Sequence, residues 1–144
     1  MILTKRCTYG LRALLRLVPA YPHGQLTGRE IAEKEDIPRK FLDQLLLSLA
    51  NSGIIQSKKG NRGGYSLAKN PAKLSIRSIL EVLSGPVLIA ECLRSDYACS
   101  KKGNCQVQVM ANEVQKQVVE YFNDLTLLQL SEKEVVKQQL EYII

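Results

Sequence analysis

Apolar side chains recur every three to four residues along the first fifty positions of the chain, a spacing that places them on one face of a helix. The first such stretch predicts an amphipathic helix over residues 4–20, ended by a turn that contains proline and glycine. A second, shorter helix is predicted over residues 28–35, because Thr27 and Glu30 have the spacing of a capping box. The chain is therefore expected to begin with two helices separated by a turn.

A third helix is predicted from Pro38 to about Asn51, since proline suits the first position of a helix, where its missing N–H has no partner. Two helices joined by a short turn, the second one longer and basic at its start, form the helix-turn-helix layout. Residues 54–58 and 65–67 are predicted to be strands joined by a glycine-rich turn. This hairpin would be the wing of a winged helix-turn-helix.

The second half of the chain is predicted to be helical too, with a polar loop over residues 91–105. One helix begins after Ser75, and a long helix follows the loop over residues 106–123. The apolar positions of the long helix are Val107, Met110, Val114, Val118, Tyr121 and Leu125. Their steps are close to a heptad pattern, which predicts a homodimer through this helix, with an ordinary intramolecular helix as the alternative. A capping-box sequence that starts at Ser131 predicts a final helix.

These elements predict a mainly α-helical chain in two parts, a winged helix-turn-helix domain over residues 1–73 and a dimerisation and cysteine-bearing region over residues 74–144. The chain is long enough to bury a core without disulfide bonds. Residues 1–73 contain 13 Lys and Arg against 5 Asp and Glu, a net charge of +8. Residues 74–144 contain 7 against 9, a net charge of −2, so a polyanion is expected to bind the first part alone.

Several classes of protein are not supported by the sequence. No apolar run approaches the roughly 20 residues of a membrane span, and the N-terminus lacks the pattern of a signal peptide, so we expect a cytoplasmic protein without a membrane partner. No Ser-His-Asp, Cys-His or paired-carboxylate arrangement is visible, and the single histidine, His23, lies in a turn. We therefore do not expect this protein to be an enzyme. The uneven charge argues against a purely structural interaction module.

The basic part is predicted to bind double-stranded DNA, with the third helix in the major groove and the wing near phosphates or a narrow minor groove. Arg and Lys can donate to guanine, Gln can pair with adenine, and the acid Asp43 can accept from cytosine N4; the alternative for Asp43 is a solvent-facing residue. Thr4, Lys5 and Arg29 are expected to bind phosphates. The predicted DNA-binding residues are Thr4, Lys5, Arg29, Pro38, Arg39, Lys40, Asp43, Gln44, Lys59 and Arg62.

Three of the four cysteines, Cys92, Cys99 and Cys105, lie in the polar loop. Structural disulfides are not expected in the cytosol, and the spacing lacks the Cys-x2-Cys pairs typical of structural zinc. Thiolates on an irregular loop suit an iron–sulfur cluster, whose negative charge Arg94, Lys101 and Lys102 would offset. Zinc, thiol redox sensing and unliganded cysteines stay open as alternatives.

Several motifs together resemble the IscR-type winged-helix regulators, a family that includes IscR, NsrR and CymR. The motifs are Leu3-Thr4-x4-Tyr9-x2-Arg12-Ala13-Leu14, Phe41-Leu42-Asp43-Gln44-Leu45-Leu46, Gly60-x2-Gly63-Gly64-Tyr65-x-Leu67, the cysteine loop and Leu125-Thr126-Leu127. The resemblance covers nearly the whole chain. It implies a cytoplasmic homodimer that binds palindromic operators, in whose cluster-bearing members a 2Fe-2S or 4Fe-4S centre modulates DNA binding.

The resemblance also implies that Cys92, Cys99 and Cys105 are the cluster ligands, with a 2Fe-2S centre favoured over a 4Fe-4S centre. It implies base reading by Asp43 and Gln44, and wing contacts by Lys59 and Arg62. The signals sensed across the family include redox and iron–sulfur status, nitric oxide, iron and cysteine supply. The expected function is thus a DNA-binding transcription regulator whose operator binding an iron–sulfur cluster modulates, and the alternative is a cluster-free thiol- or metabolite-responsive repressor of the CymR type.

This chain departs from the family pattern at two places. Six residues rather than the usual five separate Cys92 from Cys99, and Gln108 stands where the IscR branch has a histidine. In NsrR-like relatives, a residue from the start of the first helix of the partner subunit completes the cluster, which makes Cys7 the candidate fourth ligand. The alternative is that Cys7 is a small buried side chain on the apolar stripe of the first helix.

Overall fold

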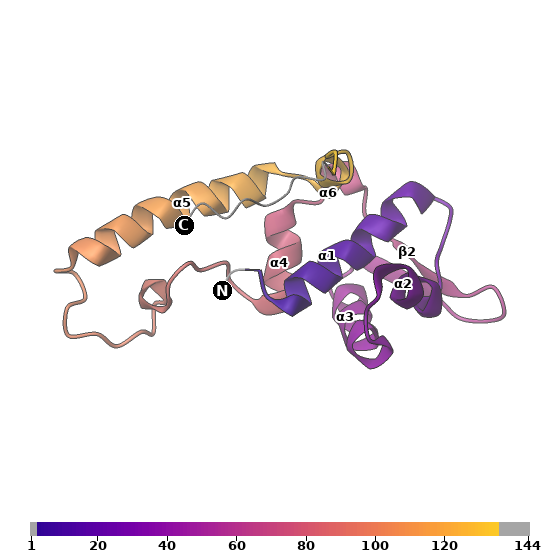
Figure 1. Ribbon diagram of the computed structural model, residues 1–144, viewed down its shortest axis with the longest axis horizontal. Helices are drawn as coiled ribbons and strands as arrows, with labels where there is room; N and C mark the ends of the chain where they lie inside the picture. The colour runs from indigo at the N-terminus through magenta and orange to yellow at the C-terminus, as the bar shows by residue number, and fades with distance from the viewer. Residues whose placement is uncertain (1–2, 136–144) are drawn as a thin grey trace.

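A helix-turn-helix and a β hairpin form the N-terminal part of the computed structural model, which describes residues 3–135 (Figure 1). The elements are α1 (Lys5–Leu17), the 3₁₀ helix η1 (Val18–Ala20), α2 (Gly28–Glu35), α3 (Arg39–Asn51), β1 (Ile55–Lys58) and β2 (Gly64–Leu67). The strands are antiparallel, with Ile55 opposite Leu67. The mainly helical winged helix-turn-helix predicted from the sequence is therefore confirmed.

The start of α2 and the turn to α3 are set by a few residues close in sequence. The Thr27 hydroxyl accepts a hydrogen bond from the Glu30 N–H at 3.1 Å, and the Glu30 carboxylate accepts one from the Thr27 N–H at 2.7 Å, which forms the predicted capping box. That backbone N–H holds the pKa of Glu30 below its ordinary value. Asp36 ends α2 in the left-handed region, with φ of 52°. α3 begins at Arg39, because Pro38 is extended and is the N-cap rather than the first helical residue as predicted.

The wing is fastened to the rest of the domain at its base. The N–H and C=O of Leu26 exchange hydrogen bonds with those of Tyr65 at 3.0 and 2.7 Å. Gly64 must lack a side chain here, since a Cβ on it would lie 2.7 Å from the Leu26 carbonyl oxygen. The base of the wing is thus held beside the start of α2.

The second half of the described chain contributes to the same core as the first. Its elements are the 3₁₀ helix η2 (Pro71–Lys73), α4 (Ile76–Ser84), the 3₁₀ helix η3 (Glu91–Leu93), α5 (Gln106–Asp124) and α6 (Leu127–Ser131). One cluster of buried apolar side chains extends from Cys7 on α1 to Leu127 on α6. α4 approaches α1 at Gly10, where a Cβ would lie 2.5 Å from the Leu83 side chain. The boundary between residues 73 and 74 therefore stays a prediction, because packing crosses it.

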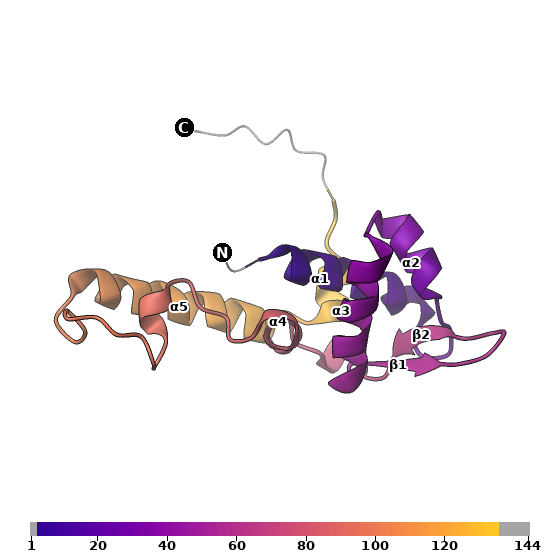
Figure 2. The ribbon, with the colours of Figure 1, turned by 90° about the horizontal axis from the view of Figure 1, so that it is seen from below.

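α5 extends away from the body and carries the cysteine loop at its far end (Figures 1 and 2). Ala111 is the one residue of this helix that is buried among those described. Most of the predicted apolar seam is exposed in the single chain, namely Val107, Met110, Val114 and Tyr121. Val118 and Leu125 pack partly against the core. The helix is confirmed, and its apolar face points largely to solvent.

The C-terminal region differs from the expectation. Ser131 does not open a helix: it is the last residue of α6, and its hydroxyl donates to the Leu128 carbonyl at 2.6 Å. The capping box lies instead at Thr126 and Gln129, at the start of α6. The final helix predicted after Ser131 lies largely outside the described residues. Within residues 3–135, no helix is both long and apolar enough to cross a membrane.

Candidate functional site

The outward face of α3 presents a row of polar side chains. Leu42, Leu45, Leu46 and Leu49 turn inward and are buried. Arg39, Lys40, Asp43 and Gln44 are all exposed, as predicted from the helical pattern. Figure 2 shows α3 on the near side of the molecule, with the wing extending beyond it. The helix that would read bases and the wing therefore occupy one side of the fold.

Two side chains on this face are already engaged with each other. The Arg39 guanidinium donates to an Asp43 carboxylate oxygen at 2.9 Å, one helical turn away. Arg39 also lies over the start of α2, where a Cβ on Gly28 would be 3.0 Å from its Nη2 atom. The Asp43 carboxylate thus orients Arg39 in the unbound chain. The contact of Asp43 with a cytosine amino group stays a prediction.

α2 is tied to α1 by a carboxylate that the sequence analysis did not single out. Glu35, whose side chain is only 13% exposed, accepts hydrogen bonds from Arg16 and, at 3.0 Å, from Arg12. Arg12 also donates to the Glu35 backbone carbonyl, and its guanidinium lies 5.5 Å from the centre of the Tyr9 ring. Since α2 and α3 form the helix-turn-helix, this contact helps to fix how the helix-turn-helix sits on α1.

The tip of the wing carries exposed cations on a glycine-dependent turn. Lys58, Lys59 and Arg62 are exposed, and the Arg62 carbonyl accepts a hydrogen bond from the Gln25 side chain. A Cβ on Gly63 would lie 2.3 Å from the Lys58 carbonyl oxygen, so this turn requires glycine. The predicted position of Lys59 and Arg62 on a basic wing agrees with this geometry.

The predicted phosphate-binding residues outside α3 and the wing lie at two places, the start of α1 and the start of α2. Thr4 caps α1, accepting from the Cys7 N–H at 3.3 Å, and its hydroxyl also contacts the Ser84 hydroxyl at 3.1 Å. Lys5 is exposed at the same end of α1. Arg29 is exposed on α2, and its hydrogen bond to Glu33, 2.9 Å long, raises the pKa of Arg29. The Thr4 hydroxyl is therefore already used within the protein.

The three loop cysteines line one small pocket at the far end of α5. The residues around it are Cys92, Tyr97, Cys99, Lys101, Lys102, Cys105, Val107 and Gln108. All three thiols are free, and that of Cys99 belongs to an exposed residue. The three cysteines therefore share one pocket with Lys101 and Lys102. Within residues 3–135, however, no three Cys, His, Asp or Glu side chains lie close enough together to hold a metal ion.

Arg94 pairs with an acid two residues further along the cysteine loop. It forms a two-point ion pair with Asp96, with contacts of 3.0 and 2.7 Å, instead of facing the pocket. The hydrogen bond between them raises the pKa of Arg94 and lowers that of Asp96. Asp96 pairs with Arg94 in the described chain, and the offset of negative charge at the cysteines by Arg94 stays a prediction.

Two glutamines of α5, one heptad apart, hold the chain that leads to the cysteines. The Gln108 amide donates to the Cys92 carbonyl at 3.3 Å and accepts from the Gly103 N–H at 3.2 Å. The Gln115 amide accepts from the Ile89 N–H at 2.9 Å and donates to the Val87 carbonyl. Gln108 therefore joins two parts of the cysteine loop.

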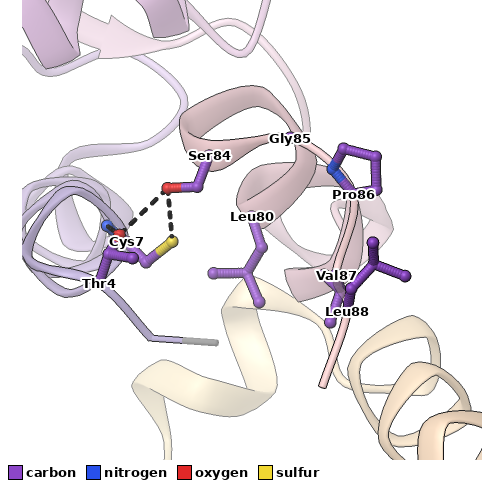
Figure 3. A pocket seen from close by; sticks show the side chains of 8 residues that line it. All are labelled: Thr4, Cys7, Leu80, Ser84, Gly85, Pro86, Val87 and Leu88. Atoms are coloured by element: carbon purple, nitrogen blue, oxygen red, sulfur yellow. Dashed lines mark hydrogen bonds between the residues drawn. The ribbon is translucent and has the colours of Figure 1, made fainter. Parts of the chain in front are cut away.

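Cys7 lies away from the other cysteines, in the contact between α1 and α4. It is fully buried, and its thiol donates to the Ser84 hydroxyl at 3.1 Å (Figure 3). Thr4 reaches the same hydroxyl, so Ser84 joins both residues to the end of α4 (Figure 3). A small pocket opens beside this contact, lined also by Gly85 and Pro86. In the single chain Cys7 therefore has the place of a small buried side chain, the alternative considered from the sequence.

Comparison with known proteins agrees with this arrangement. A family model, Rrf2, described as an iron-dependent transcriptional regulator, matches residues 3–133. An rrf2-like HTH-type transcriptional regulator of Rhodobacter capsulatus is 33% identical over 134 residues, which cover 88% of this chain and 89% of that protein. IscR of Pectobacterium atrosepticum is 25% identical over 137 residues, covering 94% of this chain and 83% of that protein.

A solved structure is similar as well. The structure of CymR, called the global cysteine regulator of B. subtilis, has a TM-score of 0.74 and 25% identity, and it covers 91% of this chain and 96% of that one. These relatives are transcriptional regulators and not enzymes, in agreement with the prediction from the sequence.

Proposed function

Since the chain belongs to the Rrf2 family of DNA-binding transcriptional regulators, we propose that it represses from a palindromic operator as a cytoplasmic homodimer, and that an iron–sulfur cluster on its cysteine loop modulates operator binding. The observation that carries the proposal is the pocket at the end of α5, where Cys92, Cys99 and Cys105 bring three free thiols together with two lysines. The polar face of α3 and the basic wing supply the other half of the proposal.

The proposed DNA contacts follow from the exposed side chains of α3 and the wing. Arg39, Lys40, Asp43 and Gln44 occupy the N-terminal, outward part of α3, which is the part of a recognition helix that meets base edges. Lys59 and Arg62 would meet phosphates or the minor groove. Lys5 and Arg29 are exposed and would bind phosphates, whereas Thr4 would have to share its hydroxyl with Ser84.

The proposed dimer follows from the exposed face of α5. A 19-residue helix with a single buried residue leaves a stripe of apolar side chains in water. Apolar side chains at near-heptad spacing can be buried against the same side chains of a second copy of the chain. Two copies related in this way would present two copies of α3 to two half-sites about one DNA turn apart.

The cysteine pocket has the chemistry that an iron–sulfur cluster needs. Cys92, Cys99 and Cys105 are free thiols on irregular backbone, and Lys101 and Lys102 would offset the negative charge of the thiolates. Because these thiols do not yet form a metal-binding group, loop 91–105 must draw together to ligate one centre. When bound, a cluster, with 2Fe-2S favoured over 4Fe-4S, would supply a group that responds to redox state, iron–sulfur supply or nitric oxide.

The fourth ligand stays a prediction. Cys7 would have to come from the partner subunit, because α5 carries the loop away from the body of its own chain (Figures 1 and 2). Its thiol would also have to leave the Ser84 hydroxyl and turn out of the core. Exposing this buried contact to water would cost free energy. Cys7 can therefore bind the cluster only if cluster binding loosens α1 from α4.

A continuous segment connects the loop with the DNA-binding domain. Gln108 and Gln115 hold residues 87–92 along α5, and this segment leads back through Gly85 to Ser84. Ser84 in turn contacts Thr4 and Cys7 at the start of α1. Contraction of the loop would therefore strain the contact between α1 and α4. Because Arg12 on α1 pairs with Glu35 on α2, the same strain would act on the position of α2.

The second candidate function is a cluster-free thiol switch. The exposed Cys99 thiol and the likeness to CymR favour it, since such a thiol can be oxidised without any metal. In this version the same loop would respond to an oxidant, and the same segment would carry the response.

Purification without oxygen distinguishes the two candidates. The cluster proposal predicts a coloured protein with bound iron and acid-labile sulfide, which Cys99→Ser loses while its far-UV circular dichroism is unchanged. Cys7→Ser is the matched control: retention of colour and iron removes Cys7 from the ligand set, and loss of both keeps it there. A colourless wild-type protein that takes up no iron and sulfide on reconstitution would contradict the cluster and leave the thiol switch.

A further inference from the structure

Leu47 is an apolar side chain on the polar face of the recognition helix. It is 62% exposed, whereas Leu45, Leu46 and Leu49 beside it in sequence are buried. Seven residues separate it from Lys40, which at about 100° per residue places the two within roughly 20° of each other around α3. Leu47 therefore continues the row formed by Lys40, Asp43 and Gln44.

The surroundings of Leu47 do not suit a protein partner. An exposed apolar patch that marks a docking surface for another protein comprises several neighbouring apolar side chains. The exposed large apolar residues of the described chain lie mainly on α5, which extends to the opposite side of the body from the wing (Figure 2). Within residues 3–73, Leu3 is the other large apolar side chain that is exposed, and it precedes α1. The neighbours of Leu47 on the face of α3 are instead charged or amide side chains.

The base pairs of DNA expose one kind of apolar group in the major groove. The C5-methyl of thymine is the feature that apolar side chains contact there, and it distinguishes a T·A pair from the other three. Three residues beyond Gln44 correspond to about 4.5 Å along the helix axis, which is close to the roughly 3.4 Å spacing of successive bases. Leu47 thus reaches about one base pair beyond the base that Gln44 meets.

We propose that Leu47 reads a thymine by packing against its C5-methyl group, at the base pair next to those contacted by Lys40, Asp43 and Gln44. The proposal rests on the DNA-reading role of α3 described above. It assigns an apolar specificity contact to a helix whose other exposed residues read hydrogen-bonding groups.

Replacement of thymine by uracil tests the contact, because it removes only the methyl group. The duplex is the one that the wild-type protein enriches from a random-sequence library, and each thymine in it is replaced in turn. Burial of one methyl-sized group is worth about 0.8 kcal/mol, so a single uracil in one half-site should weaken wild-type binding about fourfold at constant salt. Leu47→Ala should bind the thymine and uracil duplexes equally, since alanine does not reach the methyl.

Gln44→Ala is the matched control, since it removes a neighbouring contact and should keep the uracil penalty at that thymine. Alanine at exposed position 47 favours the helix, so far-UV circular dichroism should not change. An equal uracil penalty in wild type and Leu47→Ala, or none at any thymine, would overturn the proposal. Unchanged DNA binding with an altered sedimentation coefficient would assign Leu47 to a protein contact instead. Failure of the library to yield any enriched duplex would contradict the DNA-reading role of α3 itself.

Discussion

Replacement of Glu35 by alanine tests how the helix-turn-helix is held on α1. The variant removes a carboxylate that is 13% exposed and leaves Arg12 and Arg16, whose side chains are 43% and 48% exposed. Loss of one partner from a fully buried ion pair costs about 3–5 kcal/mol, and an exposed pair is worth about 0.2–1 kcal/mol. Because both guanidinium groups stay half in water, we expect a loss of about 1–2 kcal/mol in the free energy of unfolding.

Urea unfolding followed by far-UV circular dichroism measures this loss, and Glu33→Ala is the matched control. Glu33 lies on the same helix and also pairs with an arginine, but both side chains are mostly exposed. We expect Glu33→Ala to leave the unfolding midpoint unchanged. Equal destabilisation by the two substitutions would refute the reasoning, since it would mean that burial does not set the strength of these pairs.

Three further outcomes are expected. Val114→Glu places a charge in the exposed apolar seam of α5 and should convert dimers to monomers in analytical sedimentation. Lys116→Glu, about 200° around the same helix, should leave the dimer intact. Dimers in both variants would place the interface elsewhere. Gln108→Ala removes two hydrogen bonds of the cysteine loop and should speed tryptic cleavage at Lys101 and Lys102 without loss of helix content. An unchanged cleavage rate would show that Gln108 does not hold the loop. If Arg62 contacts a phosphate, Arg62→Ala should reduce the slope of log affinity against log salt by about 0.9 per subunit, and an unchanged slope would remove it from the interface.

Local features of the fold were predictable because their causes lie within a few residues. The capping box depends on Thr27 and Glu30 alone, two residues three positions apart. The polar row on α3 followed from helical periodicity. The one-residue error at Pro38 has the same origin, since its backbone geometry decides between N-cap and first helical position.

Contacts between distant elements were not predictable from the pattern. The carboxylate of Glu35 meets arginines 19 and 23 residues away, on a different helix. The role of Gln108 depends on where an irregular loop places Cys92 and Gly103. These features required the tertiary structure.

The affinity of anaerobic protein for its selected duplex, measured with and without iron–sulfur reconstitution, tests the central claim most directly. Effectors of this kind typically change affinity about 5- to 150-fold. We expect a change of that size for the wild-type protein, and none for Cys99→Ser, whose pocket lacks one of its three thiols. Equal wild-type affinities in the two forms, at the same salt concentration and with the cluster shown by bound iron and sulfide, would contradict the claim that the cysteine loop controls DNA binding.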